Sequence, residues 1–403
     1  MAKSNKIYLD YAASFSANPS SIHSFGVDAK KKLARARKEV AGVLGGRSEE
    51  IIFTSGGTES NNLAIQGAAL AWRGKGFPHI ITTNIEHPSV LETFKLLDKR
   101  KLAQISIVSV EKNGIVDPKK IKKEIKKNTI LVSVMYANNE IGTIQPIREI
   151  AKEIRHWNKQ NLFSYVLFHT DAVQAVNYLD LNMERLGVDL LSFSGSKIEG
   201  AGKVGVLCKK KSVLLSKIFG GGDQEMGLRP GTENLPEILK FSKALQFTQK
   251  VKEKETKRLT KLRDYFFAKL FNLKNKNQNF RAGLAGVGDP ENRGPEKISD
   301  FYFSINGDLK NRLPNNVNIT FPNIPSDLLV IELSARGIMC SSKSACKSGD
   351  GKASYVIKAI NKNISEEDGS LRFSLGRDTT KKDIDYTIKA LSEILTKLKK
   401  WYD

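Results

Sequence analysis

Short apolar runs alternate with longer helical patterns through the first half of the chain. Seven of these runs are rich in Val, Ile, Leu and Phe without regular polar alternation, which is typical of strands covered on both faces of a mostly parallel sheet. Between them, apolar residues recur at helical spacing, as in residues 29–44 and 58–72. The order predicts an α/β domain with a wound sheet, whose strands we expect at residues 50–54, 79–82, 104–110, 130–135, 166–169, 190–193 and 204–207.

The pattern changes near residue 245. Residues 246–274 predict one long, lysine-rich amphipathic helix, which is followed by a loop rich in Gly, Pro and Asn at 281–294. Mixed strands and helices then lead to a terminal helix at 384–401. We therefore predict a large domain over residues 12–245 and a smaller α+β domain over residues 246–403, with residues 1–11 packed on the smaller one.

The composition is that of an ordinary globular protein with a strongly basic surface. Of the 403 residues, 40% are hydrophobic and 27% are charged, and the formal net charge is +22. A basic surface can attract nucleic acid or acidic proteins. The lysines lie mainly in helical runs, such as 119–127 and 250–257, and no zinc-finger or aromatic RNA-binding signature accompanies them. We interpret these runs as solvated helix faces and expect no direct nucleic-acid binding.

The cysteines and the N-terminus indicate a cytoplasmic protein. No apolar run approaches the roughly 20 residues that cross a bilayer, and the first residues lack the apolar core of a signal peptide. Three cysteines do not form a disulfide framework. Cys208 and Cys340 lie in apolar runs and are expected to be inert core thiols. We assign no metal ligands.

Four features occur in an order that suits one cofactor. They are a glycine-rich turn at 54–59, His87 after the second predicted strand, Asp171 after the fifth and Lys197 after the sixth. This series can supply a phosphate cradle, a group that stacks on a ring, a carboxylate for a pyridine nitrogen and a Schiff-base lysine. Those are the requirements of pyridoxal 5'-phosphate (PLP).

Each feature also has a simpler explanation. A Gly-Gly turn before a helix is often only a tight connection, although a helix N-terminus favours a phosphate. Asp171 can be a helix N-cap, His87 a structural residue and Lys197 merely solvated. Their shared order favours the cofactor roles: we expect Lys197 to be a nucleophile in apolar surroundings and His87 to stack on the ring and move protons.

Two further residues point to sulfur chemistry on an amino acid. Cys346 lies in a polar, glycine-containing segment beside Lys343 and Lys347, which favour the reactive thiolate. An incidental surface thiol is the alternative. Arg372, in a strand-like segment of the second domain, can bind a carboxylate through two hydrogen bonds, and an inter-domain salt bridge is its alternative.

The chain closely resembles the cysteine desulfurases of the iron–sulfur-cluster and nitrogen-fixation type, which are PLP enzymes of fold type I related to class-V aminotransferases. Any one matching segment is weak, but together they cover nearly the whole chain in the family's order. The segments are residues 8–13, 18–26, 53–61, 86–90, 138–142, 169–174, 192–197, 229–234, 341–346 and 371–377.

The resemblance implies a role for each candidate residue. Lys197 binds the cofactor covalently and moves the substrate's Cα proton. Cys346 attacks the sulfur of L-cysteine, which leaves a persulfide on the enzyme and releases L-alanine. The family would be a homodimer that passes its sulfur to an iron–sulfur scaffold or a tRNA-thiolation enzyme. The remaining implied cofactor contacts are His87, Asp171, Gln174, Gly57, Thr58, Ser194, Ser196, Asn139 and, from the partner subunit, Thr232, while Asn139 and Arg372 would bind the substrate carboxylate.

The sequence departs from the family pattern at four places. Ser196 stands where the family usually has histidine, so we expect weaker cofactor binding. The stretch between residues 13 and 18 is shorter than usual, Lys343 replaces a small residue, and the segment around 283–294 looks inserted. These changes affect the active-site entrance, the cysteine loop and the choice of partner.

Two other functions fit the same sequence. A related PLP lyase or a selenocysteine lyase would use the same cofactor residues with another substrate. An inactive basic adaptor would keep the fold and bind RNA or an acidic partner, which Ser196 and the net charge of +22 leave open.

Overall fold

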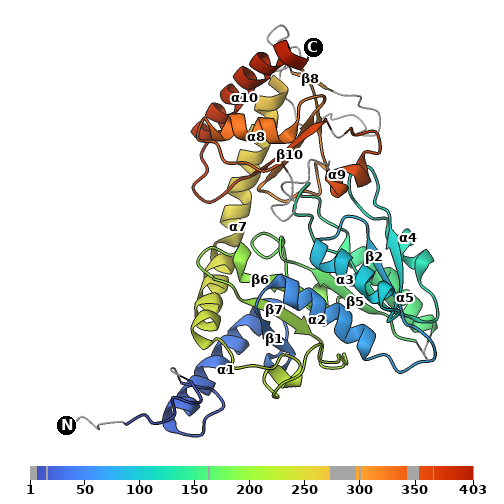
Figure 1. Ribbon diagram of the computed structural model, residues 1–403, viewed down its shortest axis with the longest axis vertical. Helices are drawn as coiled ribbons and strands as arrows, with labels where there is room; N and C mark the ends of the chain where they lie inside the picture. Colours follow the sequence, from blue (N-terminus) through green and yellow to red (C-terminus); the bar gives the residue numbers. More distant parts are fainter. Residues whose placement is uncertain are drawn as a thin grey trace.

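The computed structural model describes residues 7–14, 17–161, 164–272, 296–298, 301–342, 354–365 and 367–402. Within them, two sheets lie at opposite ends of an elongated molecule, with the N-terminus at one end and the C-terminus at the other (Figure 1). The larger sheet belongs to the first half of the chain and the smaller sheet to the last third, as the sequence predicts.

The larger sheet has seven strands, mostly parallel, in the order β1-β7-β6-β5-β4-β2-β3. Only β7 runs antiparallel, to both β1 and β6. The predicted α/β fold class is thus confirmed, and the predicted strands agree with the observed ones to within about two residues at each end. The strands are β1 (Ile51–Thr54), β2 (His79–Thr83), β3 (Gln104–Val108), β4 (Thr129–Ser133), β5 (Leu167–Asp171), β6 (Leu190–Ser194) and β7 (Gly205–Lys209).

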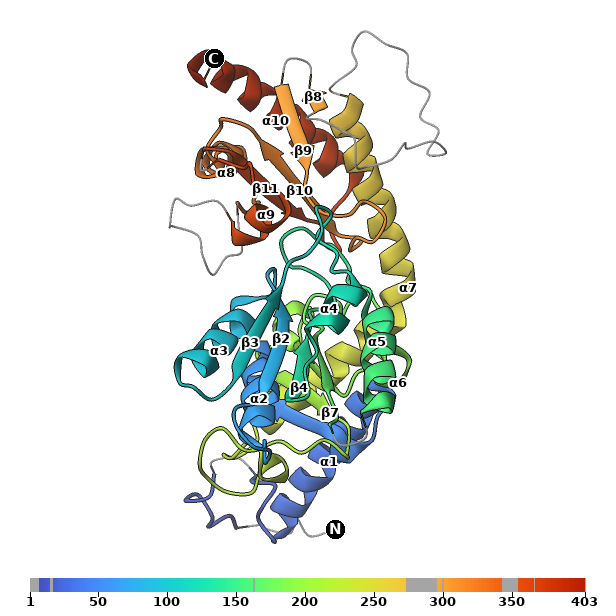
Figure 2. The ribbon, with the colours of Figure 1, turned by 90° about the vertical axis from the view of Figure 1, so that its right-hand side faces the viewer.

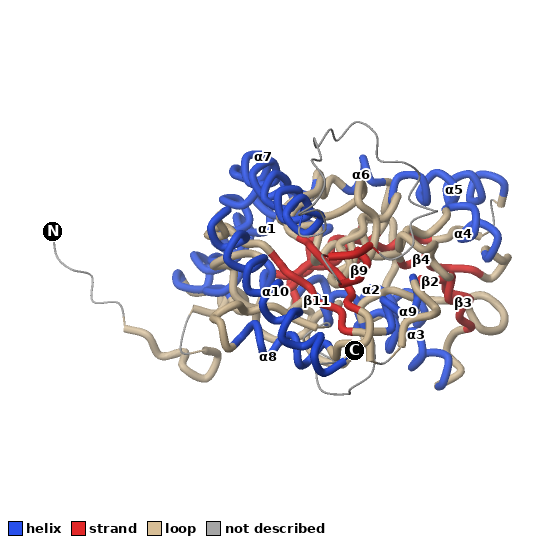
Figure 3. Tube along the Cα trace, turned by 90° about the horizontal axis from the view of Figure 1, so that it is seen from above, coloured by secondary structure: helices blue, strands red, loops and turns tan. Residues whose placement is uncertain are grey.

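Helices cover both faces of this sheet, which explains its continuous apolar strands (Figure 3). One core includes apolar side chains of α1, α5 and the start of α7. A second core includes those of α2 and α3. The helices of this region are α1 (Ser24–Leu44), α2 (Gly57–Leu70), α3 (Pro88–Lys99), α4 (Pro118–Glu124), α5 (Ile147–Gln160) and α6 (Met183–Leu186), with short 3-10 turns at Ser48–Glu50, Gly195–Lys197 and Glu225–Gly227.

The smaller sheet has four strands in the order β11-β10-β9-β8, all paired antiparallel. Its core combines residues of β9, β10 and β11 with α8, α10 and the second half of α7. The elements are β8 (Glu296–Ile298), β9 (Phe301–Ile305), β10 (Asn316–Phe321), β11 (Gly369–Ser374), α8 (Ser326–Ser334), α9 (Tyr355–Ile360) and α10 (Lys381–Tyr402).

One helix joins the two regions. α7 (Leu235–Asn272) runs along one side of the molecule, from the region of the larger sheet to that of the smaller one (Figure 2). Ile238, Phe241 and Leu245 belong to the core of the large sheet, whereas Leu259 and Phe266 belong to the core of the small one. The predicted boundary at residue 245 therefore falls inside a continuous helix, where the helix passes from one core to the other. The division into two domains stays a prediction.

The N-terminal segment contacts the start of α1. Tyr8 lies edge-on to Phe25, with ring centroids 5.9 Å apart, and the Asp10 carboxylate contacts His23 Nε2 at 3.1 Å. This place is at the far end of the molecule from the four-stranded sheet (Figure 1). The predicted packing on the smaller domain is therefore not seen for residues 7–14. No helix in the described part of the chain is both long and apolar enough to cross a membrane.

Candidate functional site

Most of the predicted site residues follow parallel strands at one edge of the large sheet. His87 comes after β2, Asn139 after β4, Asp171 ends β5 and Lys197 lies just beyond β6. The turn that contains Gly57 follows β1, which runs in the same direction as β6 because both are antiparallel to β7. Ligands of open α/β sheets bind at this carboxyl edge. The topology therefore gathers these residues from distant parts of the sequence.

The turn between β1 and α2 fits closely against its neighbours. A Cβ on Gly57 would lie 2.8 Å from Val173 Cγ2 and 3.4 Å from Ser194 Cβ. A Cβ on Gly205 of β7 would lie 2.4 Å from the carbonyl of Gly56, so the glycine in β7 lets this turn approach the sheet. The first N–H groups of α2 thus lie beside the end of β6, in an arrangement that suits a phosphate.

Ser194 and Ser196 are hydrogen-bonded to each other next to this turn. Their Oγ atoms are 3.0 Å apart, and Ser194 Oγ also accepts the N–H of Ser196 at 3.3 Å. Ser194 is buried, whereas Ser196 and Thr58 are exposed. The buried Ser194 thus lies beside the N-terminus of α2, and its hydroxyl is hydrogen-bonded to that of the exposed Ser196.

Lys197 is exposed, so the expectation of apolar surroundings is wrong for this chain by itself. The physical reason is that β6 ends at Ser194, and Lys197 lies in the 3-10 turn beyond the buried strand. Asn177 donates from Nδ2 to the backbone carbonyl of Lys197 at 2.6 Å, which fixes the lysine main chain and leaves its side chain unconstrained by that contact.

Asp171 is a buried carboxylate to which no cationic side chain of the described residues is bonded. It is only 5% exposed, and its oxygens accept hydrogen bonds from Asn61 Nδ2 at 2.7 Å and from the N–H of Val173 at 2.9 Å. Burial raises its pKa above the ordinary value, while nearby His87 and the two hydrogen bonds act in the opposite direction. A cation placed against this carboxylate would restore its ionised form.

His87 caps α3 and is connected to Asp171 through two side chains. Its Nδ1 accepts the N–H of Ser89 at 3.1 Å and lies 2.8 Å from Ser89 Oγ. Asn61 Nδ2 donates to Ser89 Oγ at 2.9 Å as well as to Asp171. Burial lowers the pKa of His87; Asp171 opposes this effect and Lys197 adds to it. Two residues that the sequence analysis did not assign, Asn61 and Ser89, therefore connect His87 with Asp171, and Lys197 lies close enough to act on His87 electrostatically.

Glu86 is a second buried acid that the sequence analysis missed. Its carboxylate accepts Thr83 Oγ1 at 2.6 Å and the N–H of Met135 at 2.9 Å, and burial raises its pKa to about 8. Tyr355 Oη donates to the Glu86 carbonyl at 2.6 Å. An acidic residue before a histidine was the only signal, and it gave no hint of burial.

Asn139 and Arg372 meet across the two regions. Arg372 Nη1 donates to the Asn139 carbonyl at 3.0 Å. Arg372 Nε and Asn139 Oδ1 are both buried, and neither has a hydrogen-bond partner among the described residues. Burial lowers the pKa of Arg372, and nearby Glu140 opposes this effect. The predicted inter-domain salt bridge is not formed by these contacts, since Arg372 bonds to a backbone carbonyl.

For the remaining described candidate residues the structure gives burial but no side-chain contact that defines a role. Gln174 is half-buried in the turn after Asp171, and Thr232 is exposed in the loop before α7. Cys346, with Lys343 and Lys347, lies outside the described residues. The two described cysteines fit the prediction of unreactive thiols: burial raises the pKa of Cys340 to about 11 and that of Cys208 further still.

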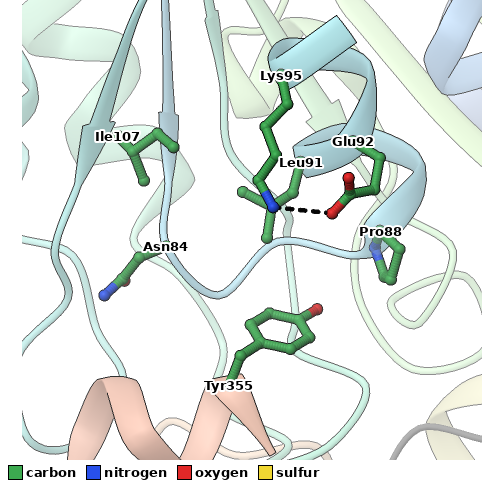
Figure 4. Close-up of a pocket in the computed structure, with 7 residues that line it drawn as sticks. All are labelled: Asn84, Pro88, Leu91, Glu92, Lys95, Ile107 and Tyr355. Atoms are coloured by element: carbon green, nitrogen blue, oxygen red, sulfur yellow. Dashed lines mark hydrogen bonds and ion pairs between the residues drawn. The ribbon is translucent and has the colours of Figure 1, made fainter. Parts of the chain in front are cut away.

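A cavity of about 230 Å³ lies next to the loop that carries His87, but it contains none of the predicted site residues. Figure 4 shows Tyr355 of α9 facing α3 across this cavity, with the Lys95–Glu92 ion pair on the opposite wall. The cavity therefore separates α9 from α3 beside the site. Its lining residues are Asn84, Pro88, Leu91, Glu92, Lys95, Ile107 and Tyr355.

The chain's residues fit PLP at this edge of the sheet. The glycine turn and Ser194 suit its phosphate, and Asp171 is a buried acid that calls for a positive ring nitrogen. Lys197 and His87 lie close enough to influence each other electrostatically. The unpartnered Arg372 Nε remains available to a carboxylate.

Comparison with known families agrees with this site. The family model described as "Aminotransferase class-V" matches residues 3–281. A protein named cysteine desulfurase IscS from Dictyoglomus turgidum is 40% identical, and the alignment covers 98% of this chain and 95% of that protein. A protein of the same name from Methanosarcina thermophila is 39% identical, with 97% and 88% covered.

Solved structures show the same fold. A NifS-like protein has a TM-score of 0.80 and 33% identity, covering 94% of this chain and 92% of its own. A protein named SspA, solved in complex with cysteine, has a TM-score of 0.69 and 29% identity, covering 89% and 90%. The chain therefore belongs to the class-V aminotransferase family, among its PLP-dependent cysteine desulfurases.

Proposed function

We propose that this chain removes the sulfur atom of L-cysteine, leaves it as a persulfide on Cys346 and releases L-alanine. The observation that carries the proposal is the pair of unpartnered buried atoms on Asn139 and Arg372. Arg372 Nε is a donor and matches a substrate carboxylate, while Asn139 Oδ1 is an acceptor for a donor group of the substrate or cofactor. A buried polar atom without a partner is costly, so a ligand that satisfies both atoms is favoured.

The proposed reaction divides the work between the chain and its cofactor. Bound PLP supplies an electron sink for charge that develops on the substrate carbons. The Cys346 thiolate attacks the substrate sulfur, so that an S–S bond forms while the Cβ–S bond breaks and its electron pair passes to Cβ. Protonation of the carbons then gives L-alanine. Atoms and electrons balance without an external oxidant or reductant.

The residues around the ring have separate tasks. Lys197 holds the cofactor and moves the Cα proton. Asp171 pairs with the ring nitrogen and Gln174 with the phenolic oxygen, while Gly57, Thr58, Ser194 and Ser196 hold the phosphate. His87, whose pKa is lowered by burial, is neutral near pH 7 and so can exchange a proton there.

The assembly and location are also part of the proposal. Thr232 is exposed in the loop before α7, as expected of a residue that reaches into the site of a second subunit. We infer a cytoplasmic homodimer that gives its sulfur to an iron–sulfur scaffold or a tRNA-thiolation protein. The basic surface, with a net charge of +22, favours an acidic acceptor.

The experiment compares two substitutions. Lys197→Ala should abolish the visible absorption of the bound cofactor, because the covalent link is lost. Cys346→Ala should keep that absorption and stop alanine formation from L-cysteine, and Cys340→Ala is the matched cysteine control that should keep both. Unchanged turnover in Cys346→Ala would exclude this nucleophile.

The same assay separates the alternatives. A selenocysteine lyase would form alanine from L-selenocysteine and not from L-cysteine. An inactive adaptor would form no alanine from either substrate and would lack the visible band. Trapping the persulfide on Cys346 before pull-down would identify the acceptor protein.

A further inference from the structure

Four side chains form a continuous hydrogen-bonded chain beneath the proposed cofactor site. The order is Asp171, Asn61, Ser89 and His87, with successive distances of 2.7, 2.9 and 2.8 Å. Asn61 comes from α2, Asp171 ends β5, and Ser89 and His87 lie at the start of α3. Asn61, Ser89 and Asp171 are all nearly inaccessible to solvent. The chain is therefore part of the protein's interior.

The direction of each hydrogen bond follows from the donors. The Asn61 amide has one NH₂ group, and it donates both to the Asp171 carboxylate and to Ser89 Oγ. Ser89 Oγ accepts a hydrogen bond from Asn61, so the hydroxyl hydrogen of Ser89 is free to point to His87 Nδ1. The backbone N–H of Ser89 also points to that nitrogen and can only donate.

Two donors on Nδ1 determine the protonation of the ring. Nδ1 has to be an acceptor, so the neutral imidazole carries its proton on Nε2. Forming the imidazolium would add the ring's second proton at Nδ1, where it would point against the Ser89 N–H. Among the described residues, the charged groups that act on this ring are Asp171, which favours the imidazolium, and Lys197, which disfavours it.

The orientation of Asn61 is supported by the same contacts. Its Oδ1 is buried and has no hydrogen-bond partner in the part of the chain that the structure describes. Turning the amide over would leave that oxygen facing the Asp171 carboxylate, which is repulsive. Asp171 and Ser89 both accept hydrogen bonds from the Asn61 NH₂ group and therefore fix the orientation of the amide, although this leaves Oδ1 without a partner among the described residues.

We propose that Asn61 and Ser89 are positioning residues that link the carboxylate of Asp171 to His87 and keep the histidine as the neutral Nε2–H tautomer. Nε2 is then the ring nitrogen that can donate or exchange a proton. The importance of this tautomer for catalysis rests on the role proposed above for His87, but the tautomer itself does not.

The test is nuclear magnetic resonance of the full-length protein with ¹⁵N-labelled histidine, first without PLP and then with it. Protonated and unprotonated ring nitrogens resonate far apart, and the chain has only five histidines, so His87→Asn identifies the signal. We expect wild-type His87 to be the Nε2–H tautomer. Ser89→Ala removes one of the two donors to Nδ1, so it should weaken the preference for the Nε2–H tautomer and raise the pKa of His87 by about 0.5–1 unit. Asn61→Ala frees Ser89 Oγ from its role as an acceptor and should act in the same direction.

Two controls separate this effect from general damage to the fold. Ser89→Thr keeps the hydroxyl group and should retain the wild-type tautomer and pKa. Thr93→Val removes a similarly buried hydroxyl one turn along α3, which bonds to Ser89 O and Asn62, and should leave His87 unchanged. An Nδ1–H tautomer in the wild type, or no change in both alanine variants, would overturn the proposal.

Activity distinguishes the failure of this proposal from that of the proposed function. If His87 exchanges protons during turnover, the acidic limb of the rate against pH should move upward in Ser89→Ala by the same amount as the pKa. A shift of the resonance without a shift of the rate profile would support the positioning role and contradict the catalytic role of His87.

Discussion

On one side of the proposed cofactor site, Asp171 and His87 are fixed by side chains from α2 and α3 and are largely shielded from water. On the other side, Thr58, Ser196 and Lys197 are exposed. The ring-nitrogen side is thus preorganised by this chain alone, whereas the phosphate side obtains its remaining partners from the cofactor and, as proposed, from Thr232 of a second subunit. Substitutions on the first side should affect chemistry, and those on the second side should affect binding.

Of the substitutions that test this difference between the two sides, Asp171→Asn should have the largest effect, which is on the turnover of L-cysteine. The substitution keeps the size of the side chain and removes the charge that would pair with the ring nitrogen. A buried charge pair of about 3 kcal/mol corresponds to roughly a hundredfold in rate, and we expect turnover of L-cysteine to fall by about that factor. The measurement is the rate of alanine formation at saturating PLP. Asp180→Asn, in the same connection but paired with Arg185, should leave the rate unchanged.

The second prediction concerns the loop that leads to Thr232. Glu225 in this loop is buried and forms a double ion pair with Arg37 of α1, with both distances at 2.6 Å, and it also accepts the N–H of Phe53 in β1. Glu225→Gln leaves Arg37 without a counter-ion, so the free energy of unfolding should fall by about 3 kcal/mol.

Chemical denaturation measures this loss, and the exposed pair Lys257–Glu253 provides the control. Glu253→Gln should not move the unfolding midpoint, because solvent screens such a pair. Equal unfolding midpoints for the two variants would mean that the Glu225–Arg37 pair does not stabilise the loop that leads to Thr232.

The third prediction uses the raised pKa of Glu86. Burial raises the pKa of folded Glu86 to about 8, so it keeps its proton up to that pH, whereas the unfolded chain loses it near the ordinary glutamate pKa of 4.5. Between these values the folded state binds more protons, so this group makes the protein less stable as the pH rises. Glu86→Gln should remove that slope, with a gain relative to the wild type on the order of 2–4 kcal/mol between pH 5 and pH 8.

Denaturant midpoints of both proteins at pH 5.5 and 8.5, measured without cofactor, test this difference. Parallel pH dependences would show that Glu86 is ionised in the folded protein. An ionised Glu86 would also add a second negative charge that acts on Asp171. The ring-nitrogen side would then carry two buried negative charges instead of one.

The smallest effects are expected on the phosphate side. Ser194→Ala should raise the dissociation constant of PLP about fivefold, as loss of one hydrogen bond of about 1 kcal/mol implies. Ser196→Ala should change it by less than about twofold, because an exposed hydroxyl is readily replaced by water. Equilibrium titration of the apoprotein with PLP measures both, and a larger effect for Ser196 would reverse the assignment.

The strands and the order of the site residues could be predicted from the sequence, because buried parallel strands are continuous apolar runs and the site follows their ends. The start of α7 could not. Leu235, Ile238, Phe241 and Leu245 pack on the large sheet, so the lysine-rich pattern that follows marks a change of core and not the beginning of a helix.

The hydrogen bonds between side chains within the site could not be predicted from the sequence either. Asn61, Ser89 and Asp171 touch through side chains from three separate elements, and no spacing along the chain encodes those contacts. Lys197 was expected in apolar surroundings because the run before it is buried, but burial ends at Gly195, and Ser196 and Lys197 are exposed. Chemistry indicated which residues matter, and only packing showed how they are held.

The continuity of α7 constrains how this protein can change in evolution. An α-helix turns by about 100° per residue, so one residue inserted between Leu245 and Leu259 would rotate the four-stranded sheet relative to the larger one. Arg372 would then swing away from the Asn139 carbonyl, although no residue of the site had changed. Insertions in this helix would be tolerated only in lengths that restore its rotational phase.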